Sequence, residues 1–580
     1  MGKKKIFLFV IFVVAVVLRF YRIDSIPPSL TWDEAAWGYN AYSLGMDGRD
    51  EFGRFLPIDY LESFGDYKPP LYAYLTVLPV KLFGLNEFAV RFPSALFGSL
   101  TVLVTYFLVK EIFFRQKEDK KEKMDKKTDT ILNYTPLVTT GLLAISPWHI
   151  NLSRAAFEAN IASLFIITGI WLFLYSLRTK SWLLVVSSIS FVLSLYTFNT
   201  ARIVVPLLGT ILMAAFFKKL WNMKQIVVTA GIVVVIMSIP VVRFMLTPQA
   251  QLRYQEVNIF SDLSIVKDAN TSMQTDYNIL HDKGYCPECD PVSQKEIPFW
   301  SRIIHNRRYR YAIEFIRHYV HHFRPSFLFI QGDGNPKFST QDVGQFYLWS
   351  APFLILGLLY LIREKRGFWW FVPLWLLIGI IPAATARETP HALRIETTLP
   401  TWQILTAYGV LTALLFIKQH IRSAFLKKSA YSILTLVLAL NVLYYLHGYY
   451  VFYPKEYSEH WQYGYKEAIT YAQSEYENYD AIVVTTELGR PYIYALFYTR
   501  FSPIKFRSTA QIEREVYGFV HVNQFDKFYF TNDTHTTARK FKHPLVIDVP
   551  NNVPDKVPVI KTFNLLSGEP ALVSYTYTLL

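Results

Sequence analysis

The chain has 580 residues, of which 52% are hydrophobic, 17% aromatic and 18% charged, whereas soluble domains carry about 25% charged residues. This composition excludes disorder, and the 2 cysteines in the chain are too few for a disulfide-built scaffold. The formal net charge of +14 does not indicate a nucleic-acid partner, because the basic residues lie in short loops between apolar segments rather than on one accessible face.

The first apolar segment, residues 6–21, follows three lysines and ends near Arg19 and Arg22. A secretory signal peptide is the alternative interpretation, but no small-x-small cleavage motif follows the segment. We therefore expect an uncleaved membrane span whose amino end lies in the cytoplasm.

Further apolar segments along the chain have the length and composition of membrane spans. They cover residues 88–113, 131–147, 159–177, 182–198, 203–217, 226–244, 345–362, 368–385, 395–417 and 429–451. The loops that then fall on the cytoplasmic side each hold two to seven Lys or Arg, as the positive-inside rule requires. These loops are residues 115–129, 178–181, 218–225, 363–367 and 418–428. We expect a multi-pass protein of the plasma membrane with its carboxyl terminus outside.

The predicted fold is that of a polytopic α-helical membrane protein with about 11 spans over residues 1–451. Outer juxtamembrane helices are expected, and residues 69–83 in the first long outer loop, 22–87, have the pattern of an amphipathic helix along the interface. The second long outer loop, 245–344, is polar with scattered aromatics. Residues 452–580 are predicted to form an extracytoplasmic α/β domain. Its apolar runs predict strands at 481–486, 527–530 and 544–549, and a helix at 491–501.

The segment SLTWDEAAWGYNAYSLG follows the first span and holds two adjacent carboxylates. Thr31 and Glu34 fit a capping box, so a helix is expected to begin at Thr31 with Glu34 bound to the Thr31 amide. Neighbouring residues on a helix point about 100° apart, which leaves Asp33 as the freer carboxylate. The alternative interpretation of Asp33 is a partner of the helix dipole.

Charged residues recur at the predicted outer ends of the spans. Lys68 precedes two prolines that hold it at membrane-surface depth, where its ordinary role is that of a snorkelling anchor. Glu87 with Arg91, and Arg154 with Glu158, are each four residues apart and most simply form helix pairs.

The remaining outer turns add positive groups. Arg202, His391 and Arg394 lie in short turns between spans, and ionisable residues in such places point by default into a cavity. A cavity at the lipid boundary with one carboxylate and several cations would suit a lipid phosphate.

The order of these motifs resembles a known group of enzymes. A DE pair after the first span, then KPPL, LFG and E-x-x-x-R, all within residues 31–98, is similar to the GT-C membrane glycosyltransferases. The nearest groups are the bacterial aminoarabinose transferases of lipid A and the dolichyl-phosphate-mannose protein mannosyltransferases. The stretches PHALR, QGDGNPKFSTQDVGQFYL and YPKEYSEHWQYGYKEA look like an uncharacterised bacterial branch, and the resemblance covers nearly the whole chain.

The resemblance implies a polyprenyl-phosphate-linked sugar as donor. It implies that Asp33 is the catalytic acidic residue of the DE motif, that Lys68 lies near the donor phosphate, and that Glu158 is a second acidic position. In the aminoarabinose transferases an acid directly precedes the lysine of the KP motif, whereas here Tyr67 does and Asp66 stands one residue further away. Glu34, Asp66, Arg154 and Glu158 are thus further candidates for the cavity.

The leaving group indicates a mechanism. A polyprenyl phosphate departs as an anion that needs stabilising charge rather than a proton, for which the candidates are Lys68, Arg202, His391 and Arg394. The acceptor hydroxyl must lose a proton, and Asp33 is the expected general base. Direct displacement would invert the anomeric carbon, in a hexosyl- or pentosyltransferase whose acceptor is a lipid, a polysaccharide or a protein.

No cofactor or metal is required by this mechanism, and metal dependence stays open. Cys286 and Cys289 form only half of a zinc site; a local disulfide is one alternative, and a structural zinc with His281 and Asp290 is the other. Two other functions compete with the enzyme, namely a multispan transporter and a membrane scaffold that presents the C-terminal domain. A transporter typically shows repeats and broken spans, and neither is evident in the sequence.

Overall fold

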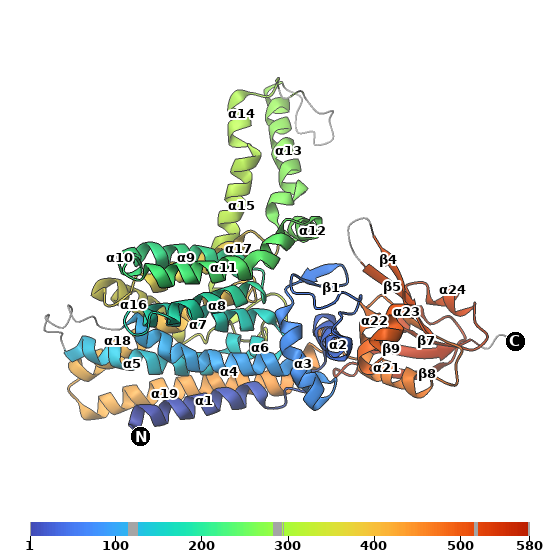
Figure 1. Ribbon diagram of the computed structural model, residues 1–580, viewed down its shortest axis with the longest axis horizontal. Helices are drawn as coiled ribbons and strands as arrows, with labels where there is room; N and C mark the ends of the chain where they lie inside the picture. The colour runs from blue at the N-terminus through green and yellow to red at the C-terminus, as the bar shows by residue number, and fades with distance from the viewer. Residues whose placement is uncertain (1, 114–125, 282–292, 294, 516–519, 578–580) are drawn as a thin grey trace.

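The computed structural model describes residues 2–113, 126–281, 293, 295–515 and 520–577, and its helices and strands are shown in Figure 1. Each apolar segment that the sequence predicts contains a helix. These helices are α1 (Lys3–Phe20), α4 (Glu87–Ile112), α5 (Lys126–Ala144), α7 (Glu158–Ser176), α8 (Leu183–Leu195), α9 (Ala201–Ala215), α11 (Lys224–Met245), α16 (Ser350–Glu364), α17 (Phe371–Ala384), α18 (Thr401–His420) and α19 (Ala424–His447).

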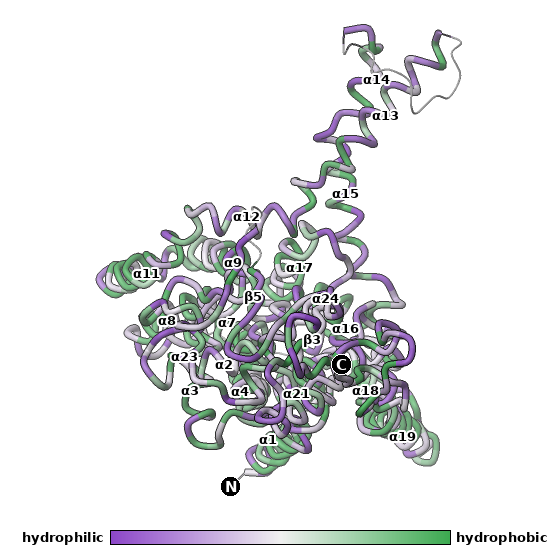
Figure 2. The backbone as a smooth tube through the Cα atoms, turned by 90° about the vertical axis from the view of Figure 1, so that its right-hand side faces the viewer, coloured by the Kyte–Doolittle hydropathy of each residue, from purple (hydrophilic) through white to green (hydrophobic). Residues whose placement is uncertain are grey.

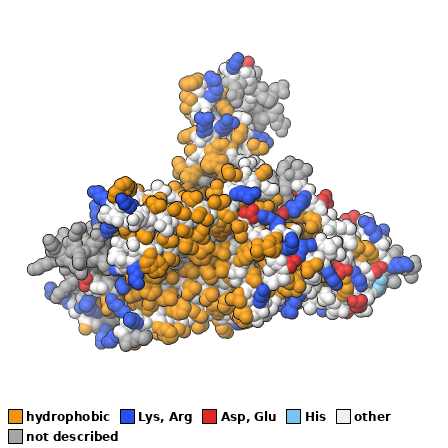
Figure 3. Space-filling model, in the orientation of Figure 1, with side chains coloured by type: hydrophobic (Ala, Val, Ile, Leu, Met, Phe, Trp, Pro, Cys, Tyr) orange, Lys and Arg blue, Asp and Glu red, His pale blue; other side chains and the backbone are white. Residues whose placement is uncertain are grey.

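Within the described ranges, 5 helices are long and apolar enough to cross a membrane, by length and composition. They are α4, α7, α11, α18 and the continuous helix Ala424–Glu456 that α19 begins. In the most apolar 18-residue stretch of each helix, only 11% of α11 and 6% of Ala424–Glu456 is buried. These helices therefore present apolar side chains outward, as lipid-facing helices do. Figure 3 shows a broad hydrophobic surface over this part of the molecule. The chain is a multi-pass membrane protein, while the count of about eleven spans stays a prediction.

The first predicted outer loop folds between the apolar helices and the C-terminal sheet (Figure 1). It contains α2 (Trp32–Asp47), a hairpin of β1 (Leu61–Ser63) with β2 (Asp66–Lys68), and α3 (Leu71–Phe83). In the hairpin Leu61 lies opposite Lys68 in antiparallel register. The helix expected over residues 69–83 is confirmed.

The second predicted outer loop forms a helical hairpin that projects from the bundle (Figures 1 and 2). Its helices are α12 (Pro248–Val257), α13 (Leu263–Leu280), α14 (Phe299–Ile304) and α15 (Arg307–His321). Cys286, Cys289 and Asp290 lie outside the described residues. His281 is described, and its Nδ1 lies 2.8 Å from the Tyr277 carbonyl oxygen.

The C-terminal part is a 7-stranded sheet with helices packed on it. The strand order is β4 (Gln511–Arg514), β5 (Val520–Phe525), β6 (Phe528–Thr531), β3 (Ala481–Thr485), β7 (Pro544–Asp548), β9 (Pro570–Thr576) and β8 (Val559–Asn564). The three strands predicted from apolar runs are β3, β6 and β7, which pair in parallel at the centre of the sheet. β3 and β7 are buried along their whole length and read as continuous apolar runs. The antiparallel strands β4, β5, β8 and β9 include polar residues and were not predicted.

Helices join this sheet to the first outer loop. They are α21 (Tyr465–Ser474), α22 (Pro491–Tyr498) and α23 (Pro503–Thr509). A further helix, α24 (Thr534–Ala538), packs on β3, β6 and β7. Helix α22 packs directly on α2, where a Cβ on Gly38 would lie 2.5 Å from the Phe497 ring. The Tyr494 hydroxyl donates to the Leu30 carbonyl at 3.1 Å. The C-terminal domain therefore packs against α2, whose first turn contains the DE pair. The division proposed between residues 451 and 452 falls inside the helix Ala424–Glu456 and stays a prediction.

Candidate active site

The DE pair lies in the first turn of α2. The Thr31 hydroxyl accepts from the Glu34 amide at 3.2 Å, and the Glu34 carboxylate accepts from the Thr31 amide at 3.0 Å. The predicted capping box is therefore confirmed. The two acids separate as expected: the Glu34 side chain is 1% exposed, whereas that of Asp33 is 51% exposed and forms an ion pair with Lys68.

Lys68 reaches Asp33 from the end of β2. Its side chain is buried, and its ammonium lies 5.2 Å from the centre of the Trp37 ring and 5.6 Å from that of Phe64. Burial alone would lower the pKa of Lys68, but the negative charges of Asp33 and Asp66 outweigh burial and raise it. The structure thus holds a fixed positive charge in an aromatic cage beside a solvent-accessible carboxylate.

Two more predicted acids belong to the same cluster. Asp66 is the first residue of β2 and Glu158 the first residue of α7. Both are close enough to Lys68 to raise its pKa. The structure therefore brings Asp33, Asp66, Lys68 and Glu158 together from three elements that are distant in sequence.

Glu34 has a structural position. Arg91 Nε donates to Glu34 Oε1 at 2.9 Å and Arg91 Nη2 donates to Oε2 at 3.2 Å. The predicted helix pair of Glu87 with Arg91 is therefore wrong. Glu87 pairs instead with Lys466 of α21 at 2.8 Å, because a partner from another element satisfies each charge better than a neighbour on the same helix.

Arg154 is also structural, and its predicted helix pair with Glu158 is wrong. Helix α6 (Pro147–Arg154) ends at this arginine and α7 begins at Glu158, so an extended turn separates the two residues. The Arg154 guanidinium is buried and donates to the carbonyls of Leu18, Tyr21 and Ile26 at 2.7 to 2.9 Å. It ties the end of α1 to the following loop.

Lys337 is a site residue that the sequence reasoning missed. Its ammonium lies 4.9 Å from the centre of the Trp32 ring, next to Asp33 in the chain. Burial lowers the pKa of Lys337, while Asp33 and Glu34 act in the opposite direction. The lysine stands in the stretch QGDGNPKFSTQDVGQFYL, about 300 residues from Asp33 in sequence, and no local pattern links the two.

The other predicted cations lie in different surroundings. Arg202 Nε donates to the Leu195 carbonyl at 3.3 Å, and its guanidinium lies 5.5 Å from the centre of the Phe244 ring. Arg394 donates to the Glu388 carbonyl at 3.2 Å. Their roles in binding phosphate stay predictions.

His391 is buried against the Phe338 ring, with ring centres 4.8 Å apart. Burial, with Arg394 nearby, holds the pKa of His391 well below its usual range. The imidazole is therefore uncharged at neutral pH and could act on a phosphate only through a hydrogen bond.

Asp333 joins the two stretches that carry Lys337 and His391. Its carboxylate accepts from the Ala392 amide at 2.6 Å and from the Asn335 amide at 2.9 Å. Burial raises the pKa of Asp333 to about 6. The sequence reasoning missed this residue because its partner is 59 residues away.

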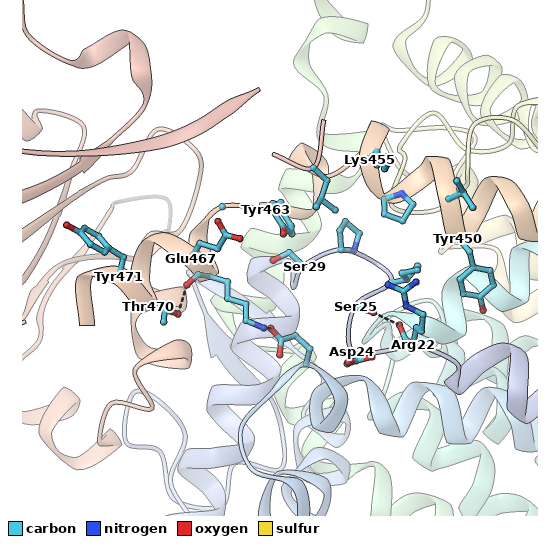
Figure 4. Close-up of a pocket in the computed structure, with 18 of the residues that line it drawn as sticks. Arg22, Asp24, Ser25, Ser29, Tyr450, Lys455, Tyr463, Glu467, Thr470 and Tyr471 are labelled. Atoms are coloured by element: carbon cyan, nitrogen blue, oxygen red, sulfur yellow. Dashed lines mark hydrogen bonds and ion pairs between the residues drawn. The ribbon is translucent and has the colours of Figure 1, made fainter. Parts of the chain in front are cut away.

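A separate cavity of about 940 Å³ lies between loop 22–29, the end of the long helix at residues 450–455, and the C-terminal domain. Figure 4 shows its polar lining, which includes Arg22, Asp24 and Glu467. None of the side chains around Asp33 and Lys68 lines it, so it is distinct from the candidate active site.

Comparison with known proteins found a family model and solved structures that are similar to this chain. Residues 9–117 match the family model described as dolichyl-phosphate-mannose-protein mannosyltransferase. No curated protein sequence matches the chain significantly. Among solved structures, ArnT from Cupriavidus metallidurans in the apo state is similar over 99% of this chain and 98% of its own, with 13% identity and a TM-score of 0.52.

The fold is that of ArnT. The same protein bound to undecaprenyl phosphate is similar over 98% of this chain and 97% of its own, with 13% identity and a TM-score of 0.50. Together with the family match, which covers the DE pair, Lys68 and Arg91, this fold confirms the resemblance to GT-C glycosyltransferases that the sequence predicted.

Proposed function

We propose that the protein is a glycosyltransferase that moves a hexose or pentose from a polyprenyl phosphate to an acceptor hydroxyl at the outer face of the membrane, with inversion. The observation that carries the proposal is the ion pair between half-exposed Asp33 and buried Lys68 at the start of α2. The amino terminus is proposed to be cytoplasmic and the carboxyl terminus extracytoplasmic.

Lys68 is proposed to hold the departing phosphate. A lysine ammonium has three donors; one is directed at Asp33, which leaves two for phosphate oxygens. A charge fixed before the reaction stabilises the leaving anion without reorganisation. Lys337, which lies over Trp32 on the same side as Asp33, is proposed as the second positive group.

Asp33 is proposed as the general base. Its carboxylate is accessible, so an acceptor hydroxyl can approach it and transfer its proton as the bond to the anomeric carbon forms. Lys68 binds the same carboxylate, so the two groups can flank one sugar ring, with the phosphate at Lys68 on one face and the acceptor hydroxyl at Asp33 on the other. The acceptor then attacks from the face opposite the phosphate, which inverts the anomeric centre. This mechanism requires no metal.

The polyprenyl-phosphate donor is inferred from two supports. The matched family model names a dolichyl-phosphate-mannose donor in its description, and ArnT, which shares the fold, was captured with undecaprenyl phosphate. The acceptor is proposed to be a lipid, a polysaccharide or a protein, and the C-terminal domain, docked on α2, to help select it.

The test is donor turnover by the purified protein. Radiolabelled polyprenyl-phosphate hexose and pentose are each incubated with the protein, and release of polyprenyl phosphate is measured. We expect release by transfer or slow hydrolysis, and a fall of about 10² to 10⁴-fold in Asp33→Asn, the usual contribution of a general base. Asp555→Asn, an exposed acid of the C-terminal domain, is the matched control. A transporter or scaffold would return both donors intact.

A further inference from the structure

The projecting hairpin lies across the direction of the apolar helices. In Figure 1 α13 and α15 stand upright while α4, α5, α18 and α19 run across the view, and Figure 2 shows the hairpin extending sideways from the bundle. Membrane spans run close to the bilayer normal. The hairpin therefore extends roughly parallel to the membrane surface.

The base of the hairpin contacts α17 near its middle at one point and at its carboxyl end at two others. The Tyr319 hydroxyl donates to the Leu377 carbonyl at 2.8 Å, and His318 Nδ1 lies 2.9 Å from the Ala386 carbonyl oxygen. On the other leg the Ile259 amide donates to the Thr385 carbonyl at 2.9 Å. This end of α17 is its predicted outer end, so the hairpin leaves the bundle at the level of the outer membrane surface.

Helix α15 has an exposed apolar face. Tyr309, Ile313, Ile316 and Val320 are 53%, 43%, 59% and 55% exposed, and their spacing of three or four residues places them on one side of the helix. Four exposed side chains of α14 add to this apolar surface, namely Phe299, Trp300, Ile303 and Ile304. Figure 3 shows hydrophobic side chains along this side of the hairpin.

The other face of α15 is occupied by α13. The Tyr311 hydroxyl donates to the Asp262 carbonyl at 3.3 Å, and Arg310 donates to the Ser272 hydroxyl at 3.1 Å. The apolar face therefore points away from the rest of the hairpin and is not packed by it.

Positive charge accompanies the apolar face. Residues 299–324 contain one acid, Glu314, and six arginines: Arg302, Arg307, Arg308, Arg310, Arg317 and Arg324. Long arginine side chains can keep their aliphatic stems on an apolar surface while their guanidinium groups reach lipid phosphates. An apolar face with a basic border is the pattern of a helix that lies in the bilayer interface.

We propose that α14 and α15 lie in the interfacial layer of the outer leaflet, with the apolar face among the acyl chains and the exposed arginines, all but Arg310, at the lipid phosphates. The apolar surface of the hairpin continues into that of α11 (Figure 3), of whose most apolar 18-residue stretch only 11% is buried. Lipid therefore covers both surfaces. The hairpin is an in-plane anchor that restrains the outer loop beside the candidate active site.

The test uses nitroxide labels on the full-length protein in lipid nanodiscs. In a chain with Cys286→Ser and Cys289→Ser, one label is attached at Ile316→Cys and another at Val320→Cys. The control is Asn270→Cys, an exposed polar position on α13. Collision rates with dissolved oxygen, which concentrates in lipid, and with a water-soluble nickel chelate are measured.

At positions 316 and 320 we expect the label to collide more often with oxygen than with the nickel chelate. At position 270 we expect it to collide more often with the chelate. Labels at 316 and 320 that meet the chelate as often as the label at 270 would overturn the proposal, because the face would then be in water. Low collision rates with both reagents would also overturn it, since they would indicate contact with a second copy or another protein.

Discussion

Arg91 and Glu34, 57 residues apart in the chain, form a buried ion pair in which two guanidinium nitrogens meet two carboxylate oxygens at 2.9 and 3.2 Å. The same guanidinium donates to the carbonyls of Ile23, Pro27 and Ser29. All five of its donors are therefore used. This network fixes the start of α2, and with it the direction of Asp33 toward Lys68.

Arg91→Leu should destabilise the protein strongly. The substitution leaves the Glu34 carboxylate buried without its partner, which costs about 3–5 kcal/mol. The thermal unfolding midpoint in detergent measures the loss. The matched control is Lys466→Leu, which removes the partner of Glu87 from an exposed position and should cost no more than about 1 kcal/mol. Equal losses in the two variants would contradict the assigned role of Arg91.

Adjacent acids should respond in opposite ways to neutral replacement. Glu34→Gln weakens the buried pair and should lower the unfolding midpoint. Asp33→Asn keeps an amide oxygen that can accept from buried Lys68, and Asp66 stays nearby, so it should lower the midpoint less than Glu34→Gln does, while donor turnover is lost. Unfolding and donor turnover are measured on the same preparations. A large fall in the midpoint of Asp33→Asn would mean that its loss of turnover reports misfolding.

Lys68→Met should weaken donor binding. A hydrogen bond to a charged group contributes about 1.5–3 kcal/mol, so the Kd for undecaprenyl phosphate should rise about 10- to 100-fold. Titration of the lipid into purified protein measures the change. Lys81→Met, on the exposed side of α3, should bind as tightly as the wild type. Unchanged affinity in Lys68→Met would place the phosphate elsewhere.

Lys337 should set the alkaline limit of activity. Burial lowers the pKa of Lys337, so its charge is lost at a lower pH than that of an ordinary lysine. Turnover should therefore fall as the pH rises through the lowered pKa. Lys337→Arg keeps its charge over this range and should shift the alkaline fall of the rate profile to higher pH. A profile that does not move would separate Lys337 from the reaction.

Asp333 should make the folded protein more stable in mild acid. Burial raises its pKa to about 6, so between about pH 4 and pH 6 the folded state holds a proton that the unfolded chain has released. This contribution is complete below the unfolded pKa and is lost as the pH rises through 6. As the pH rises from about 4 to about 6, the free energy of unfolding of the wild type should fall by up to about 3 kcal/mol relative to that of Asp333→Asn.

The comparison of unfolding midpoints at pH 5 and pH 7.5 tests this sign. The Asp333→Asn variant has no titrating group at this position. From pH 5 to pH 7.5 the unfolding midpoint of the wild type should therefore fall relative to that of the variant. Asp555→Asn should follow the wild type. A wild type that gains stability relative to Asp333→Asn toward neutral pH would contradict the assignment.

Much of the fold follows from local sequence. Apolar runs predict the helices of the membrane region because each run satisfies its backbone within its own segment. The capping box at Thr31 and the buried strands β3, β6 and β7 are likewise local patterns, and so is the separation of Asp33 from Glu34. The motifs of residues 31–98 also indicated the family resemblance.

The tertiary structure alone decided which charges meet. Glu87 and Arg91, and Arg154 and Glu158, have the spacing of helix pairs, yet each arginine binds groups brought from another part of the chain. Lys337 reaches Trp32 from about 300 residues away. A sequence pattern reports on residues within a few turns of one another, whereas a buried charge takes whichever partner offers the most complete hydrogen bonding, and that partner is known only after the chain has packed.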